Sequence, residues 1–124
     1  MKNIALLGST GSIGKSTLEV VRSNPDKLKI VSLTGGSNWQ QLADQAREFR
    51  PRFVAIASEE HAGDLRLALK DLDIKVGAGS SAIHAAVMQP GADTTVAAIV
   101  GSAGLQPVMT AISAGHQICL ANKE

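Results

Sequence analysis

The 124-residue sequence contains a single cysteine, Cys119, and no apolar run that approaches the length of a membrane span. One cysteine cannot form a disulfide within the chain, and a membrane helix needs about 20 apolar residues in succession. The N-terminus also lacks the long apolar segment of a secretion signal. We therefore expect a cytoplasmic protein that does not associate with membranes.

An excess of charge of either sign is also missing. Lysine and arginine number 12 against 11 aspartates and glutamates, which gives a net charge of +1. Such a balance gives no reason to expect nucleic acid or a membrane surface as a partner, and it leaves a small neutral or anionic ligand open. A hydrophobic fraction of 44% suffices for one compact core, so we expect one domain.

Short apolar segments alternate with segments that have helical spacing of apolar residues. The predicted strands are Asn3–Leu7, Lys29–Leu33, Phe53–Ala57, Ile74–Val76, Thr95–Val100 and Gln117–Leu120. The predicted helices are Ser16–Arg22, Trp39–Phe49, Ala62–Leu72, Ser81–Met88 and Pro107–Ser113. Strands joined by helices run parallel with right-handed crossovers. The sequence therefore predicts an α/β fold, a Rossmann-type doubly wound parallel sheet with helices on both faces.

The connection between the first predicted strand and the first predicted helix has the sequence GSTGSIG, from Gly8 to Gly14. Glycine permits a tight turn, a close approach of the backbone to a pyrophosphate, and close packing of the helix on the strand. Gly8, Gly11 and Gly14 can fill these three roles, with the N–H groups of residues 10–13 facing a phosphate at the positive end of the helix. A turn that only shapes the chain is the alternative.

Two known glycine patterns can be compared with this spacing. G-x-x-G-x-x-G is a variant of the dinucleotide-binding pattern G-x-G-x-x-G. The triphosphate-binding pattern requires a glycine five residues before Gly14-Lys15-Ser16, but position 9 is serine. We therefore reject a triphosphate-binding loop and favour a dinucleotide.

The end of the second predicted strand, Leu33 to Asn38, contains no carboxylate. NAD-binding domains usually carry Asp or Glu here, where it binds the adenosine ribose. A carboxylate would repel the 2′-phosphate of NADP, whereas glycine N–H groups such as that of Gly36, together with Ser37 and Asn38, can accept this phosphate. NADP is therefore favoured over NAD, and helix capping by Ser37 or Asn38 is the alternative use of these side chains.

Two more segments directly follow predicted strands. In a parallel sheet they lie at the carboxyl ends of the strands, as the glycine turn does. Gly101–Gly104 resembles a second loop of close approach, although a plain turn explains it equally well. Asn122, Lys123 and Glu124 come directly after the last strand, where a solvated chain end is the ordinary interpretation.

Other chemically active side chains give no site. His61, His84 and His116 lack metal-ligand spacing and are expected at the surface or at helix ends. Cys119 lies in an apolar segment and is expected to be a small buried hydrophobe. Trp39 is expected to pack in the core or on its helix. We predict no metal site and assign no catalytic residue.

Four motifs taken together, STGSIG, GGSN, IVGSAGL and ANKE, resemble the 1-deoxy-D-xylulose 5-phosphate reductoisomerase family in order and along the whole chain. The resemblance implies that residues 1–124 are an NADPH-binding domain and that the catalytic and C-terminal domains lie outside this chain. Enzymes of this family rearrange 1-deoxy-D-xylulose 5-phosphate and reduce the resulting aldehyde with NADPH to 2-C-methyl-D-erythritol 4-phosphate, in non-mevalonate isoprenoid biosynthesis.

The resemblance also implies residue roles. Those implied for the cofactor are Thr10, Gly11, Ser12 and Ile13 at the pyrophosphate, Gly36, Ser37 and Asn38 at the 2′-phosphate, and Asn122 and Glu124 near the nicotinamide. Lys123 matches the lysine that binds the sugar phosphate. The magnesium or manganese ion of the family, a Lewis acid, is held by acidic residues beyond residue 124. We therefore expect the chain alone to be inactive. The resemblance further implies that the full-length enzyme is a homodimer.

Two other interpretations stay open. A stand-alone module could sense NADP without catalysis, and another NADP-dependent oxidoreductase could share the same first domain. If the reading frame continues into an acidic metal-binding cluster, the protein is an enzyme and not a binding module. Activity on the deoxyxylulose phosphate separates this family from other oxidoreductases.

Overall fold

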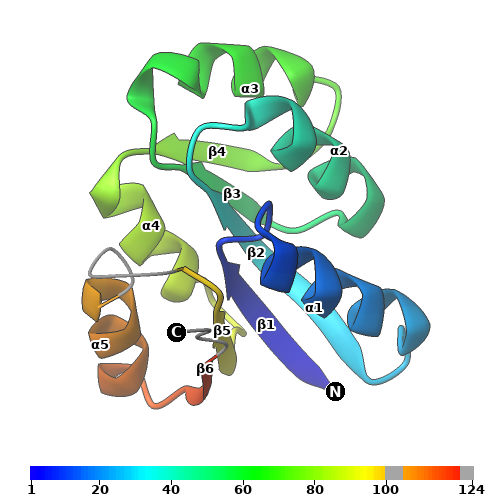
Figure 1. The fold of residues 1–124 in the computed structure, drawn as a ribbon, viewed down its shortest axis with the longest axis vertical. Coiled ribbons are helices and arrows are strands. Elements are labelled where there is room, and N and C mark those ends of the chain that lie inside the picture. Colours follow the sequence, from blue (N-terminus) through cyan, green and yellow to red (C-terminus); the bar gives the residue numbers. More distant parts are fainter. Residues whose placement is uncertain (100–104, 121–124) are drawn as a thin grey trace.

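Strands and helices alternate along the chain, as the sequence predicts (Figure 1). The computed structural model describes residues 1–99 and 105–120. Within them, the strands are β1 (Lys2–Leu7), β2 (Leu28–Gly35), β3 (Phe53–Ile56), β4 (Lys75–Ala78), β5 (Thr94–Ala97) and β6 (Gln117–Leu120). The helices are α1 (Ser12–Ser23), α2 (Trp39–Phe49), η1 (a 3-10 turn, Glu59–His61), α3 (Ala62–Ala68), α4 (Ser80–Val87) and α5 (Leu105–Ser113).

The described strands form one parallel sheet in the order β4-β3-β2-β1-β5-β6. The chain first moves outward from β1 to β4, and α4 then carries it back across the sheet to β5 on the other side of β1. The strand order therefore reverses between β1 and β5. In such sheets the crevice at the carboxyl ends of the strands on either side of this reversal is the usual ligand site. The predicted doubly wound parallel fold is confirmed.

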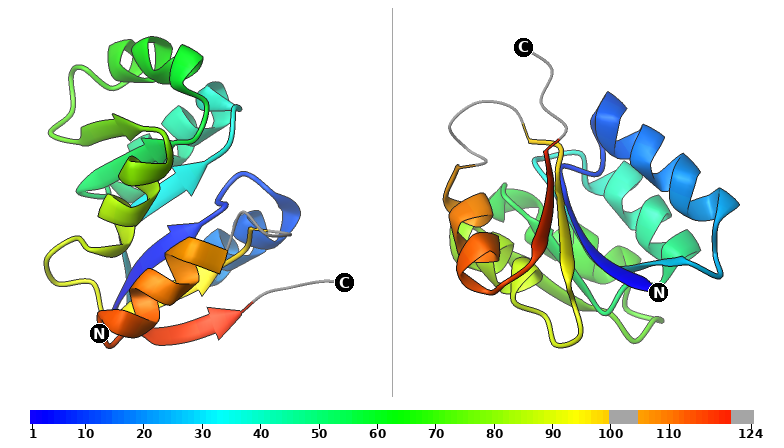
Figure 2. Two further views of the ribbon diagram at one scale, coloured as in Figure 1. Left: turned by 90° about the vertical axis from the view of Figure 1, so that its left-hand side faces the viewer. Right: turned by 90° about the horizontal axis from the view of Figure 1, so that it is seen from below.

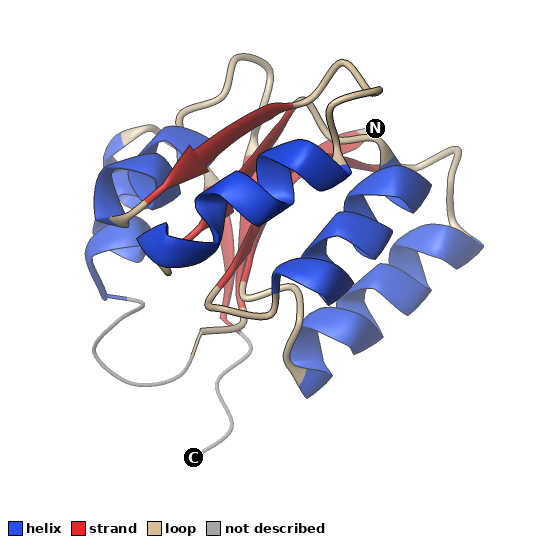
Figure 3. Ribbon diagram, turned by 90° about the horizontal axis from the view of Figure 1, so that it is seen from above, coloured by secondary structure: helices blue, strands red, loops and turns tan. Residues whose placement is uncertain are grey.

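Helices cover both faces of the sheet, with α1, α2 and α3 on one face and α4 and α5 on the other (Figure 3). The right-hand view of Figure 2 shows β1, β5 and β6 between α1 and α5. Alternate strand residues point to opposite faces, so neighbours such as Leu6 and Leu7 belong to different cores. Residues of the first core include Leu6, Leu18, Leu42, Val54 and Leu65. Residues of the second include Leu7, Phe53, Ile83, Val87 and Ala111.

The boundaries of several elements differ from the predicted ones. Helix α1 begins at Ser12 instead of Ser16, because the second half of the glycine turn is already helical. Strand β2 continues to Gly35 because Thr34, although polar, is fully buried and pairs with Ala55 of β3. Strand β5 ends at Ala97, which pairs with the last residue of β1, instead of at Val100, which lies outside the described residues.

The prediction that Cys119 is a buried hydrophobe is wrong. Its side chain is exposed, because β6 is the outermost of the described strands on its side of the sheet and, among these strands, pairs only with β5. None of the helices in residues 1–99 and 105–120 is long and apolar enough to cross a membrane.

Two glycines bring α1 close to the end of β1. Gly8 has a φ of 82°, a backbone conformation that favours glycine, and a Cβ at this position would lie 2.8 Å from the carbonyl oxygen of Ala98. A Cβ on Gly14 would overlap the carbonyl oxygen of Gly8 and lie 2.6 Å from the Cα of Ser9. Because these neighbours are backbone atoms, neither position has room for a side chain.

Replacement of Gly14 tests this contact. We expect Gly14→Ala to lower the free energy of unfolding by about 2 kcal/mol or more, because the added methyl group must push α1 away from β1. Gly63→Ala is the matched control, since Gly63 also lies in a helix but has nothing within 4 Å of an added Cβ. This change should be neutral or stabilise by about 0.5–1 kcal/mol. Urea unfolding followed by circular dichroism measures both, and equal effects would contradict the proposed packing.

Candidate functional site

The N-terminus of α1 lies at the carboxyl end of β1, where the strand order reverses. Gly11 is its N-cap residue, with φ −78° and ψ 174°. Among the described residues no side chain makes a capping hydrogen bond here, and the first turn contains no acidic residue. The first N–H groups of a helix have no acceptor within the helix, and the helix dipole makes this end positive. The turn from Thr10 to Ile13 can therefore bind an anion.

The glycines at this site are of two kinds. Gly8 and Gly14 are required by the packing of the chain, as described above. Of the described atoms, a Cβ on Gly11 would meet only the carbonyl oxygen of Gly8, at 3.9 Å, and a Cβ on Gly36 would meet none within 4 Å. The packing of the described chain therefore does not require glycine at positions 11 and 36. Glycine at these positions fits a backbone that a ligand approaches closely.

The glycine turn and the end of β2 lie against each other. The N–H of Gly8 donates to both the carbonyl oxygen of Thr34, at 3.1 Å, and its Oγ1, at 3.0 Å. The N–H of Ser9 donates to the same carbonyl oxygen at 2.8 Å. The Cγ2 of Thr10 lies 3.6 Å from the position of a Cβ on Gly35. The structure thus brings the predicted pyrophosphate turn next to the predicted 2′-phosphate edge.

The residues that follow β2, Gly36, Ser37 and Asn38, are all exposed. Asn38 is the N-cap of α2: its Oδ1 accepts the N–H of Gln41 at 3.2 Å, and its Nδ2 donates to the Gln41 side-chain oxygen at 3.2 Å. Helix capping, the alternative use of Asn38, is therefore observed. The cap occupies Oδ1 but only one of the two hydrogens on Nδ2.

A cleft of about 780 Å³ opens at the carboxyl ends of the strands, on the face of the sheet that α4 and α5 cover. This volume is in the range of small-molecule sites. Its described lining residues carry no carboxylate; they are Gly8, Thr34, Gly35, Gly36, Ala57, Ser80, Ile83, His84, Ala98, Ile99, Gln106 and Pro107. Of the predicted cofactor residues that the structure describes, only Gly36 lines the cleft itself, and the turn from Thr10 to Ile13 lies beside it.

Sequence reasoning overlooked Thr34 and His84 as site residues. Thr34 is a polar residue at the end of an otherwise apolar strand, which was an available signal. The Nδ1 of His84 lies 2.6 Å from the Oγ1 of Thr110, and this hydroxyl donates to the carbonyl oxygen of Gln106 at 3.1 Å. The direction of the hydrogen bond between Nδ1 and this hydroxyl depends on the tautomer of His84. No sequence pattern marked this histidine as a cleft residue.

The other histidines form local contacts. Nδ1 of His116, just after α5, lies 2.8 Å from the Oγ1 of Thr95, and Nδ1 of His61 lies 3.6 Å from a carboxylate oxygen of Asp64. In the described part of the chain, no three or more His, Cys, Asp and Glu side chains lie together as a metal site would need.

The remaining predicted site residues, Asn122, Lys123 and Glu124, lie outside the described residues. The predicted second glycine loop, Gly101–Gly104, lies outside them as well. Their roles stay predictions from the family resemblance.

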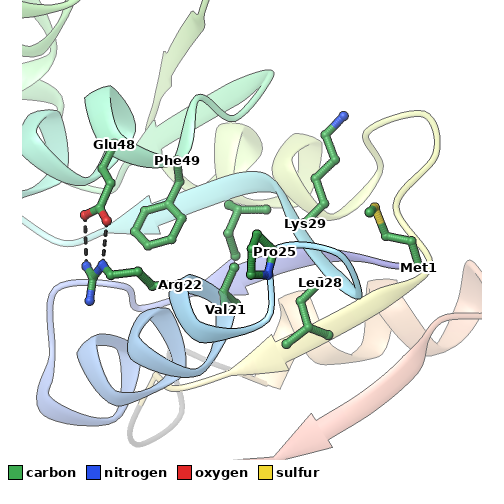
Figure 4. A pocket seen from close by; sticks show the side chains of 9 residues that line it. Met1, Val21, Arg22, Pro25, Leu28, Lys29, Glu48 and Phe49 are labelled. Atoms are coloured by element: carbon green, nitrogen blue, oxygen red, sulfur yellow. Dashed lines mark hydrogen bonds and ion pairs between the residues drawn. The ribbon is translucent and has the colours of Figure 1, made fainter.

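A second hollow, of about 310 Å³, lies at the opposite, amino-terminal end of β1 and β2 (Figure 4). Arg22 of α1 donates to Glu48 of α2 at 2.8 Å and lies 5.4 Å from the ring centroid of Phe49. The hydrogen bond from Arg22 lowers the pKa of the Glu48 carboxyl below its ordinary value. This hollow contains none of the predicted site residues, and the ion pair joins α1 to α2 at the end remote from the glycine turn.

A parallel doubly wound sheet, with an uncapped helix N-terminus where its strand order reverses, places the chain in the class of Rossmann-type dinucleotide-binding folds. Comparison with known sequences is more specific: the family model of 1-deoxy-D-xylulose 5-phosphate reductoisomerase matches residues 4–124. The chain belongs to this family.

Individual relatives agree. The 1-deoxy-D-xylulose 5-phosphate reductoisomerase of Trichlorobacter lovleyi is 48% identical over 124 residues, which are 100% of this chain and 32% of that protein. The solved reductoisomerase of Zymomonas mobilis in complex with NADPH superposes with a TM-score of 0.92 at 39% identity, over 98% of this chain and 32% of that chain. A reductoisomerase in complex with NADPH, fosmidomycin and magnesium gives a TM-score of 0.93 at 37% identity, over 98% and 30%. The chain thus spans about a third of the length of these relatives.

The capping role of Asn38 can be tested separately from any ligand. We expect Asn38→Ala to lower the free energy of unfolding by about 1 kcal/mol, because the N–H of Gln41 loses its acceptor. Asn38→Asp retains a good capping acceptor and should keep the stability of the wild type. Urea unfolding without cofactor measures both, and an equal loss in the two variants would show that the side chain does not act as a cap.

Proposed function

We propose that this chain is the NADPH-binding domain of an enzyme that rearranges 1-deoxy-D-xylulose 5-phosphate and reduces it to 2-C-methyl-D-erythritol 4-phosphate. The observation that carries the proposal is the open space at Gly11 and Gly36 beside the uncapped N-terminus of α1. Family membership supports the same function. The bound cofactor supplies the hydride that reduces the aldehyde formed in the rearrangement.

The turn from Thr10 to Ile13 is proposed to bind the pyrophosphate. Gly11 and Ser12 are exposed, and Thr10 and Ile13 are half-buried. Their N–H groups lie at the start of α1, where the helix dipole stabilises negative charge. The hydroxyls of Thr10 and Ser12 can add donors to phosphate oxygens. Gly11 lets the phosphate come close to the backbone without meeting a side chain.

The 2′-phosphate is proposed to lie at the edge formed by Gly36, Ser37 and Asn38. The exposed Ser37 hydroxyl and the second Nδ2 hydrogen of Asn38 are available as donors while the helix cap stays in place. The missing carboxylate at this edge removes the repulsion that an NAD-binding domain would exert on a phosphate. This arrangement supports a preference for NADPH over NADH.

The rest of the proposal depends on residues outside the described part of the chain. Asn122 and Glu124 are proposed to contact the cofactor near the nicotinamide, and Lys123 to bind the sugar phosphate. A relative was solved with NADPH, fosmidomycin and magnesium. By analogy we propose that the full-length protein needs magnesium or manganese, held by acidic residues beyond this chain, and that it works as a cytoplasmic homodimer. The chain alone should then be inactive.

Replacement of Gly11 tests the cofactor site in the full-length protein. Valine at this position should fill the space that the pyrophosphate needs and abolish NADPH binding. The observed φ and ψ are ordinary extended values that valine adopts easily, so the cost in stability should be at most about 1 kcal/mol, from the weaker N-cap. NADPH fluorescence titration measures binding, and circular dichroism measures the fold.

Gly63→Val is the control: Gly63 is exposed, none of the described atoms lies within 4 Å of an added Cβ, and this variant should bind NADPH as the wild type does. Unchanged NADPH affinity in a folded Gly11→Val protein would contradict the proposed pyrophosphate site. A wild-type protein that binds NADPH but does not turn over the deoxyxylulose phosphate with magnesium would instead be a binding module.

A further inference from the structure

We infer that Gln45 of α2 is a positioning residue for the NADPH site, because its side-chain amide fixes the peptide that precedes the pyrophosphate turn. The inference rests on the proposed function. Gln45 lies 36 residues after Ser9, and its Nε2 donates to the carbonyl oxygen of Ser9 at 3.0 Å. No sequence motif of the site includes Gln45.

Gln45 lies on the side of α2 that faces α1, in a hollow that residues of both helices line. Its neighbours on the buried side of α2 are Leu42, Ala43 and Ala46, and Gln45 itself is only 9% exposed. Burial of a polar side chain costs free energy unless its groups are hydrogen-bonded. Two atoms at this contact, Oε1 of Gln45 and Oγ of Ser9, are buried and make no hydrogen bond to the described residues. The hydrogen bond that Gln45 does make, from Nε2, is to the peptide that precedes the pyrophosphate turn.

The hydrogen bond from Gln45 determines the direction of the next N–H group. The carbonyl of Ser9 and the N–H of Thr10 belong to one planar trans peptide, in which they point in opposite directions. Because Gln45 holds the carbonyl toward α2, the N–H of Thr10 points away from α2. Thr34 holds the preceding N–H groups, those of Gly8 and Ser9. The backbone at Gly8 and Ser9 is thus held by Thr34 of β2 and by Gln45 of α2 before any ligand binds.

Helix α2 also carries the proposed 2′-phosphate edge at its N-terminus, where Asn38 is the cap. Gln45 therefore connects the pyrophosphate turn to the same rigid helix that places Asn38. We expect loss of this connection to weaken NADPH binding through both phosphate contacts. The chemical step, which takes place at the nicotinamide and the substrate, should change little.

Gln45→Met in the full-length protein tests the inference, since methionine has a similar length and no donor. We expect the Kd for NADPH to rise about tenfold, the loss that a buried hydrogen bond typically causes. The turnover number at saturating NADPH should stay within about twofold of the wild type. Fluorescence titration and steady-state kinetics measure the two quantities. Gln45→Leu removes the same donor and replaces Gln45→Met if that variant does not fold.

Ser32→Ala is the matched control. Ser32 is fully buried, and its Oγ donates to the carbonyl oxygen of Ala86 at 2.7 Å on the opposite face of the sheet. This variant should lose stability without a change in the Kd for NADPH.

The outcomes separate the inference from the proposed function. An unchanged Kd in folded Gln45→Met, or an equal rise in Ser32→Ala, would overturn the positioning role. A wild-type protein that does not bind NADPH would contradict the proposed function itself.

Discussion

The close contact between α1 and the end of β1 determines the geometry of the site. Helix α1 can start directly after the strand only because Gly14 has no side chain to meet the backbone of Gly8 and Ser9. Gly8 turns the chain with a φ of 82° at a point where Ala98 of the neighbouring segment leaves no room for a Cβ. Together they place an uncapped helix N-terminus at the point where the strand order reverses. The proposed anion site is thus a consequence of backbone packing.

Other residues refine this arrangement without belonging to a recognisable motif. Thr34 holds the N–H groups of Gly8 and Ser9, and Gln45 holds the carbonyl of Ser9. We infer that the donors of residues 10–13 are therefore directed by the fold and do not need to be ordered by the ligand. The end of β2 adds an edge that carries donors and no carboxylate. The fold has room for a side chain at Gly11 and Gly36 but not at Gly8 and Gly14. At Gly11 and Gly36 it is the proposed ligand that would leave no room for one.

The sequence was sufficient to predict the order of strands and helices, because buried parallel strands leave nearly continuous apolar segments between amphipathic helices. Local patterns could not predict the exposure of Cys119, which depends on the position of β6 at the edge of the sheet. They also placed the start of α1 too late, because glycine is unusual inside a helix. The contact of Gln45 with Ser9 joins two distant segments, so only the tertiary structure reveals it.

The measurement that tests the account most directly is thermal unfolding of the protein with NADPH and, in parallel, with NADH over a concentration series. A ligand that binds only the folded state raises the unfolding temperature, and the rise grows with the ratio of the ligand concentration to its Kd. The account predicts a concentration-dependent rise that is larger with NADPH than with NADH at the same concentration, because only NADPH carries the phosphate for the edge at Gly36, Ser37 and Asn38. Equal rises with both would contradict recognition of the 2′-phosphate, and no rise with either would contradict the cofactor site.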